Sequence, residues 1–186
     1  MIKSIQYLIS TFILTLLFSN AVVSQGCGEN WSVIDPPNSI ELSFGAVIWD
    51  GNQYVSVGGG SKSAVSSDGI NWMMGGNDKG DLLFSITYAK GLYVVGASNS
   101  IYVGTDGLNW ETYRLDTGAF YKGVAYGNGR FIAVGGGQCI ARSRSGRLWV
   151  KTQLNPHKWF SSIAFGAGRF VAVGGDSIFT TKDGIT

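Results

Sequence analysis

Residues that commonly build metal sites are scarce in this chain. Its 186 residues include one histidine, two cysteines and three prolines. The two cysteines, Cys27 and Cys139, are far apart, and no cysteine or histidine pair has the close spacing of a zinc site. The sequence therefore predicts neither a bound metal nor a cofactor.

Charge is also sparse. Charged residues make up 14% of the chain and the formal net charge is +2, which is too small to indicate a nucleic-acid partner. Positive charge is concentrated in one stretch, at Arg142, Arg144, Arg147, Lys151 and Lys158. A solvated edge that discourages edge-to-edge pairing is the simpler interpretation, and an anionic partner is the alternative.

The long apolar run near the N-terminus is too short for a comfortable membrane span. It covers Tyr7 to Phe18 and follows Lys3, whereas a span needs about 20 apolar residues. Small residues at Val22-Val23-Ser24 suit a signal peptidase, which predicts a signal peptide over residues 1–24. The mature protein, residues 25–186, is then secreted, periplasmic or on the cell surface, with no stable transmembrane segment. Lipid anchoring at Cys27 is an alternative, although the usual leucine of a lipobox is missing.

Glycine is abundant, and the chain repeats itself four times. Its 28 glycines are about twice the usual fraction of roughly 7%, and runs such as 58–60, 135–137 and 174–175 predict turns with unusual backbone angles. Three markers recur about every 38 to 41 positions. They are a tryptophan (Trp31, Trp72, Trp110, Trp149), an aromatic residue (Trp49, Tyr88, Tyr126, Phe165) and a short polar residue (Asp68, Asp106, Ser145, Asp183).

The pattern inside each repeat has a period of two. In 123–126 and 170–174 large apolar residues alternate with small ones, which predicts strands covered on both faces. Convincing helical periodicity is absent after residue 24. A unit of about 40 residues with several covered strands indicates an all-β fold, a β-propeller with four-stranded blades. In the second repeat we expect strands near 84–89, 92–96, 100–105 and 109–115.

About four blades are expected, near residues 44–76, 82–115, 120–154 and 159–186. The segment 28–34 resembles a fourth strand with no preceding three. One interpretation is that it closes a four-bladed ring by joining the last blade. The favoured interpretation is that the chain is a fragment, the first part of a larger ring.

A short polar box follows the third expected strand of each repeat. Segment 66–72, Ser-Ser-Asp-Gly-Ile-Asn-Trp, resembles the Asp-box of BNR-repeat propellers, the sialidase-like superfamily. It has one residue fewer between aspartate and glycine, and the third copy has Ser145 for aspartate. The resemblance implies that the boxes lie at the blade periphery and serve structure. The structural residues are then Asp68, Gly69, Trp72, Asp106, Gly107, Trp110, Gly146, Trp149, Asp183 and Gly184.

Candidate ligand-binding residues lie in the links between blades. Propellers usually bind ligands at an axial face built partly from such links, so the weak candidates are Asp78, Asp116, His157 and Lys158. No catalytic residue is assigned. A sialidase-like hydrolase needs an arginine cluster, a tyrosine nucleophile and a carboxylic acid, yet Arg114, Arg130 and Arg169 belong to three different repeats.

The sequence thus favours a secreted, non-catalytic binding or interaction module for a protein or carbohydrate. One alternative is a glycosidase, sialidase-like or a degenerate relative. Another is a scaffold or assembly factor, because related propellers occur in photosystem II assembly factors.

The export interpretation predicts the mature N-terminus. If residues 1–24 are a signal peptide, N-terminal sequencing of secreted material should begin at Gln25. A mature protein that begins at Met1 would contradict export.

Overall fold

The computed structural model describes residues 31–34, 43–115, 118–137, 139–153 and 159–184. The chain divides into two compact units, residues 1–34 and 35–186. The expected signal peptide lies outside the described residues. Residues 31–34 form no strand of their own, and the closing role considered for 28–34 stays a prediction. None of the helices in the described ranges is long and apolar enough to cross a membrane.

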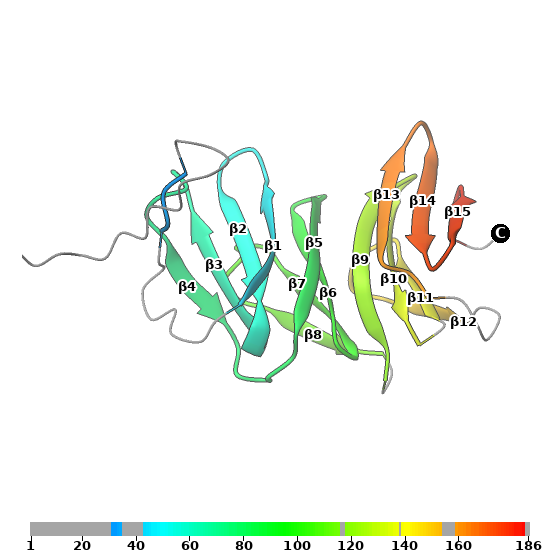
Figure 1. Cartoon of the computed structure of the whole chain (residues 1–186), viewed down its shortest axis with the longest axis horizontal. Helices are drawn as coiled ribbons and strands as arrows, with labels where there is room; N and C mark the ends of the chain where they lie inside the picture. The colour runs from blue at the N-terminus through cyan, green and yellow to red at the C-terminus, as the bar shows by residue number, and fades with distance from the viewer. Residues whose placement is uncertain (1–30, 35–42, 116–117, 138, 154–158, 185–186) are drawn as a thin grey trace, which may run out of the picture. The chain divides into compact units, whose positions relative to one another are not determined.

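The second unit consists of four antiparallel sheets, here called blades 1 to 4 (Figure 1). Blade 1 contains β1 (Phe44–Trp49), β2 (Tyr54–Gly58), β3 (Lys62–Ser66) and β4 (Met73–Gly76). Blade 2 contains β5 (Leu83–Ala89), β6 (Leu92–Ala97), β7 (Ser100–Gly104) and β8 (Glu111–Arg114). Blade 3 contains β9 (Phe120–Gly127), β10 (Arg130–Gly136), β11 (Cys139–Ser143) and β12 (Val150–Gln153). Blade 4 contains β13 (Ser162–Gly166), β14 (Arg169–Gly174) and β15 (Ser177–Thr181).

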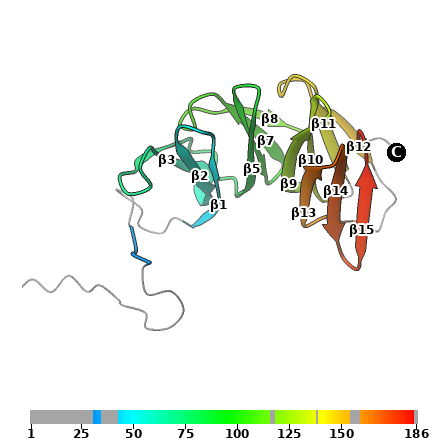
Figure 2. The same cartoon turned by 90° about the horizontal axis from the view of Figure 1, so that it is seen from above.

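Strands pair in chain order within every blade, and the first strands of neighbouring blades adjoin. β1 contacts β5, β5 contacts β9, and β9 contacts β13, and Figure 2 shows the blades following one another from β1 to β15. Among the described residues, the one helical segment is a short 3-10 turn, η1 (Gly59–Ser61). The four strands expected in the second repeat agree with β5 to β8 within two residues.

An aromatic pair recurs at one position of every blade. The last residues of the first strand pair across the sheet with the start of the second strand, which brings two rings together. The ring centroids lie 4.5 to 4.8 Å apart, within the range of favourable aromatic contacts. The pairs are Trp49–Tyr54, Tyr88–Tyr93, Tyr126–Phe131 and Phe165–Phe170.

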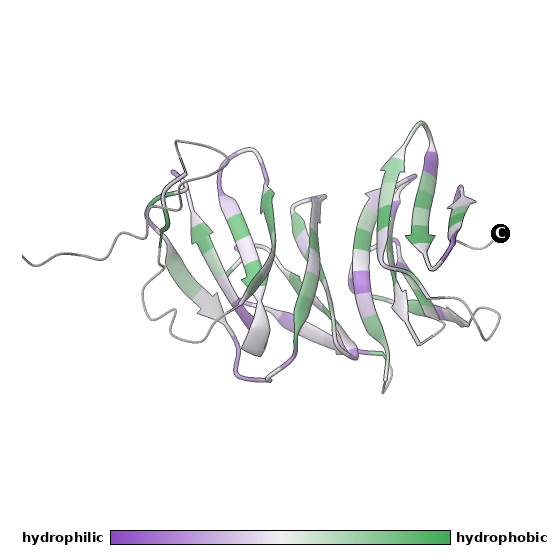
Figure 3. Cartoon of the chain, in the orientation of Figure 1, coloured by the Kyte–Doolittle hydropathy of each residue, from purple (hydrophilic) through white to green (hydrophobic). Residues whose placement is uncertain are grey.

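The hydrophobic core lies between blades, where each aromatic pair packs on the preceding blade. Tyr88 and Tyr93 of blade 2 cluster with Val55 and Val65 of blade 1. The pairs of blades 3 and 4 pack in the same way, on Val94 and on Ile132 respectively. Figure 3 shows the apolar residues as bands across successive strands.

The alternation predicts strands covered on both faces, and this holds for β6 and β10 but not for β14, where Val171 and Val173 are exposed. Val94 and Val95 point to opposite faces of β6 and each is 0% exposed, and Ile132 and Ala133 of β10 are 0% exposed as well.

Two faces remain exposed in this second unit. The aromatic pair of blade 1 is partly exposed, with Trp49 at 48% and Tyr54 at 37%, and Val171 and Val173 of blade 4 are each 40% exposed. The residue equivalent to Val173, Val134 of blade 3, is 1% exposed. Each exposed face corresponds to one side of the interface between neighbouring blades, which the chain forms three times. An arc of a larger propeller has such a face at each end.

The glycine runs serve two purposes, of which turn formation is only one. The last glycine of each expected run has a positive φ: 67° at Gly60, 80° at Gly137 and 59° at Gly175. The first glycine of a run is needed for another reason. A Cβ at Gly135 or Gly174 would overlap the carbonyl oxygen of Phe120 or Trp159 in the neighbouring segment.

Because the core lies at the blade junctions, a truncated aromatic residue should destabilise the whole unit. Phe131→Ala is expected to lower the free energy of unfolding by about 3–5 kcal/mol, since Phe131 is fully buried. Ile178→Ala, at a residue 75% exposed, is the matched control and should change little. Denaturant titration measures both, and equal losses would contradict this placement of the core.

Candidate functional site

The boxes form the turns between the third and fourth strands of blades 1 to 3, and the fourth box follows β15. Asp68 lies between β3 and β4, and its Oδ1 accepts hydrogen bonds from the backbone N–H groups of Ile70 and Asn71, both at 2.8 Å. Asp106 accepts the equivalent bonds from Leu108 at 2.9 Å and Asn109 at 2.8 Å. The carboxylates therefore close their own turns, as an Asx turn does.

The box of blade 3 keeps the same hydrogen-bonded turn, although Ser145 stands there in place of aspartate. Ser145 Oγ accepts the N–H groups of Arg147 at 3.2 Å and Leu148 at 3.1 Å, which is longer than the distances to the aspartates. A hydroxyl of the third strand also accepts the glycine N–H at 2.9 Å in three blades, from Ser66, Ser143 and Thr181. All four box glycines have a positive φ of 74° to 78°.

The boxes of blades 2, 3 and 4 also contact the preceding blade. A Cβ at Gly107 of blade 2 would overlap Val55 and Val65 of blade 1, so only glycine fits there. Gln53 Nε2 donates to the carbonyl oxygen of Asp106 at 3.1 Å. At the equivalent position of blade 3, Arg130 Nη1 donates to the carbonyl oxygen of Asp183 of blade 4 at 3.2 Å. The boxes thus join neighbouring blades.

The box tryptophans are half-buried and bond differently in different blades. Trp72 and Trp149 donate their indole N–H to the glycine carbonyl of their own box, at 3.1 and 2.8 Å. Trp110 instead donates to Ser63 of blade 1 at 3.0 Å. This bond crosses a blade junction and adds to the apolar contacts of the ring.

Hydrogen bonding holds the box carboxylates ionised. Bonds from the backbone and side chain of Asn71 hold the pKa of Asp68 well below its ordinary value of 3.8. Burial raises the pKa of Asp106, but the bonds from Asn109 and Leu108 outweigh it, so its pKa is lowered as well. Neither carboxyl is protonated at neutral pH.

A buried polar cluster between blades 1 and 2 is the feature that sequence reasoning missed. Tyr102 donates to Asp81 Oδ2 at 2.7 Å, and the hydroxyls of Tyr102 and Ser61 lie 3.1 Å apart. The backbone N–H of Asp81 donates to Ser61 Oγ at 2.8 Å. Burial raises the pKa of the Tyr102 phenol to about 12. All three residues are at most 8% exposed, so this cluster fixes the blade junction.

A second tyrosine makes a similar contact with the turn between β1 and β2. The Tyr93 hydroxyl of blade 2 donates to Asp50, and Gln53 Nε2 donates to that hydroxyl at 3.0 Å. Burial is the largest cause that raises the pKa of Tyr93. Asp50 also accepts the N–H groups of its own turn, at 2.7 Å from Asn52 and 2.8 Å from Gln53.

Four residues in the links are expected to bind ligand, and the structure describes one of them, Asp78. Asp78 is on the surface, with its side chain 91% exposed, and its Oδ1 is 2.5 Å from Lys62 Nζ. Asp116, His157 and Lys158 lie outside the described residues. No group of three or more histidine, cysteine or acidic side chains in the described ranges is placed to hold a metal.

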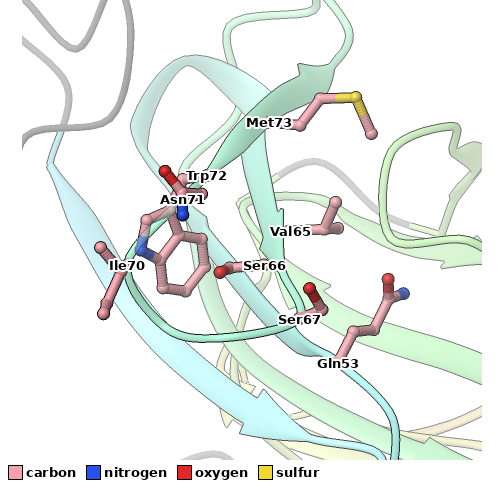
Figure 4. A pocket seen from close by; sticks show the side chains of 8 residues that line it. All are labelled: Gln53, Val65, Ser66, Ser67, Ile70, Asn71, Trp72 and Met73. Carbon is pink, nitrogen blue, oxygen red and sulfur yellow. The ribbon is translucent and has the colours of Figure 1, made fainter.

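Two grooves occupy equivalent places on blades 1 and 3. The groove of blade 1, of about 530 Å³, is lined by residues from the turn before β2, the end of β3, the box and the start of β4 (Figure 4). The groove of blade 3, of about 400 Å³, is lined from the corresponding turn, the end of β11, the box and the start of β12. The first is lined by Gln53, Val65, Ser66, Ser67, Ile70, Asn71, Trp72 and Met73. The second is lined by Arg130, Arg142, Ser143, Arg144, Ser145, Leu148 and Val150.

No protein-family model matches the chain, and no curated protein matches its sequence. Solved structures do resemble it. An ancestral GH74 enzyme superposes with a TM-score of 0.62 at 14% identity, over 76% of this chain and 23% of the enzyme. The computationally designed Ika4 protein superposes with a TM-score of 0.61 at 11% identity, over 83% of this chain and 99% of the designed protein.

The WD40 β-propeller domain of Doa1 is a third similar structure. It has a TM-score of 0.60 and 15% identity, and the match covers 77% of this chain and 52% of that chain. The chain therefore spans about a quarter of the GH74 enzyme and about half of the Doa1 chain. Identities this low establish the fold alone. Four antiparallel sheets that match parts of known propellers place the chain in the β-propeller fold.

Proposed function

We propose that this chain is a secreted, non-catalytic propeller module that binds another molecule. The observation that carries the proposal is the state of the box carboxylates. Asp68 and Asp106 each accept two backbone N–H bonds from their own turn, and a neighbouring asparagine side chain donates to the second oxygen at 2.8 and 2.7 Å. Ionised groups that are already bonded in this way are poor general acids at neutral pH.

The blade architecture supports the binding role. The four blades share one framework, and the equivalent grooves on blades 1 and 3 carry different side chains. A framework held together at the blade junctions leaves its surface residues free to vary, which is how binding sites are placed on common folds. Export is the part of the proposal that depends on residues 1–24.

The glycosidase alternative has one feature in its favour, an arginine cluster on blade 3. Its groove is lined by Arg130, Arg142 and Arg144, but its other lining residues are serines and aliphatic residues. A tyrosine nucleophile and a carboxylic acid, which a sialidase-like reaction needs, are absent from that lining. The likeness to a GH74 enzyme extends to the fold alone.

A structural role for the boxes predicts a pH-dependent loss of stability in Asp106→Asn. The pKa of Asp106 is lowered in the folded state, so its contribution is present above the ordinary value of 3.8 and is lost as the pH falls through the folded value. We expect the variant to be less stable by about 1 kcal/mol at pH 7, with the difference shrinking below pH 4.

Thermal unfolding at pH 7 and at pH 3 measures this difference. Asp78→Asn is the matched control, because Asp78 is exposed and forms a surface ion pair with Lys62; it should change the melting temperature little. If Asp106→Asn melts like the unmodified chain but loses ligand binding, the structural assignment of the box is wrong.

The absence of catalysis is tested by glycoside hydrolysis. The full chain should release no fluorescent leaving group from aryl glycosides, including an aryl sialoside, above the rate of a heat-denatured sample. Turnover that is lost in Arg142→Gln would establish the enzyme and contradict the proposal.

A further inference from the structure

We propose that the groove of blade 3 binds a phosphomonoester carried on a body of about the size of a sugar. The inference rests on the proposed binding function and names its ligand class. Three arginines line the groove: Arg130 at the start of β10, Arg142 in β11 and Arg144 just after β11. Arginine binds tetrahedral oxyanions through several N–H donors at once.

The charge of this groove departs from the repeat, whereas its shape does not. At the equivalent positions of blade 1, Gln53 stands for Arg130, Val65 for Arg142 and Ser67 for Arg144. A groove is present on blade 1 with these uncharged residues. Three arginines are therefore not needed to form the turn. Arg130 also bonds the box of blade 4, but Arg142 and Arg144 have no such role among the contacts of the described residues.

Two nitrogen atoms of these arginines are buried without a partner. Arg142 Nη1 and Arg130 Nε each have almost no exposed surface and make no hydrogen bond within the described part of the chain. A buried N–H group without an acceptor is costly, and more so in a cation. These two atoms are covered by the chain itself, so they show the cost of placing arginines here, and an anion in the groove would meet the exposed parts of the same side chains.

Nearby acids neutralise only part of the charge. Among the described residues, one carboxylate pairs with one of these arginines: Asp183 Oδ2 lies 4.0 Å from Arg130 Nη1. The other acid in this region, Glu111, pairs with Arg147 instead. An excess of roughly two positive charges remains, which matches a phosphomonoester with a charge of about −1.5 to −2 at pH 7.

The rest of the lining suits the body of such a ligand. Ser143 Oγ and Ser145 Oγ accept backbone N–H groups, which leaves each hydroxyl proton available for donation. Leu148 and Val150 are 80% and 55% exposed and offer an apolar strip. A volume of about 400 Å³ lies at the lower end of the range for small-ligand sites, roughly 300–1,000 Å³.

Calorimetric titration of the full chain tests the groove, with glucose 6-phosphate as the main probe. Inorganic phosphate, sulfate and glucose are the comparison probes. We expect glucose 6-phosphate to bind, inorganic phosphate to bind more weakly at the same site, sulfate to bind more weakly still, and glucose not to bind.

Variants that copy blade 1 separate the groove from general charge. Arg142→Val and Arg144→Ser install the residues of blade 1 at these positions and so should fold; each is expected to weaken binding at least tenfold. Arg114→Gln removes an exposed arginine of β8 outside the groove and should leave the affinity unchanged.

Each result has a distinct consequence. No binding of glucose 6-phosphate, or equal binding by Arg142→Val and the unmodified chain, would overturn the groove assignment and leave the non-catalytic function standing. Tighter binding of sulfate would overturn the ligand class. Release of inorganic phosphate from the probe, lost in Arg142→Val, would support the groove and overturn the non-catalytic function.

Discussion

The packing of an aromatic pair on the aliphatic face of the preceding blade is the contact on which this fold depends. Tyr88 and Tyr93 pack on Val55 and Val65, and the same contact recurs at the next two junctions. A single repeat cannot bury its apolar face alone, and stacking on neighbouring repeats buries it. Stability therefore arises between repeats, which explains why the aromatic period persists while the polar residues vary.

The boxes help to orient each blade on the preceding one. In blade 2 the box glycine, Gly107, approaches Val55 and Val65 of blade 1, and the carbonyl of Asp106 accepts a bond from Gln53 of that blade. Hydrogen bonds fix the angle at which one sheet meets the next, while apolar contact supplies most of the stabilisation. The carboxylate holds the turn in the shape that both contacts need.

Much of the fold could be predicted because its determinants are local and periodic. The spacing of Tyr88, Tyr126 and Phe165 predicts strands and blades directly. The contact of Asp81 with Tyr102 could not be predicted, because the two residues are joined only when blades 1 and 2 stack. The arginine groove was visible in part, as a concentration of positive charge. Burial of Arg142 Nη1 needs three dimensions to be seen.

A departure from the repeat is most informative where the equivalent residue of another blade is buried. Val65 is 6% exposed in blade 1, and its equivalent in blade 3 is Arg142. Replacing a buried aliphatic residue by a cation costs solvation energy that the fold does not recover from Asp183 alone, at 4.0 Å from a different arginine. Serine in place of aspartate at position 145, by contrast, keeps the hydrogen bonds of the turn. The first departure leaves a buried cationic nitrogen without an acceptor among the described residues, whereas the second leaves the turn fully bonded.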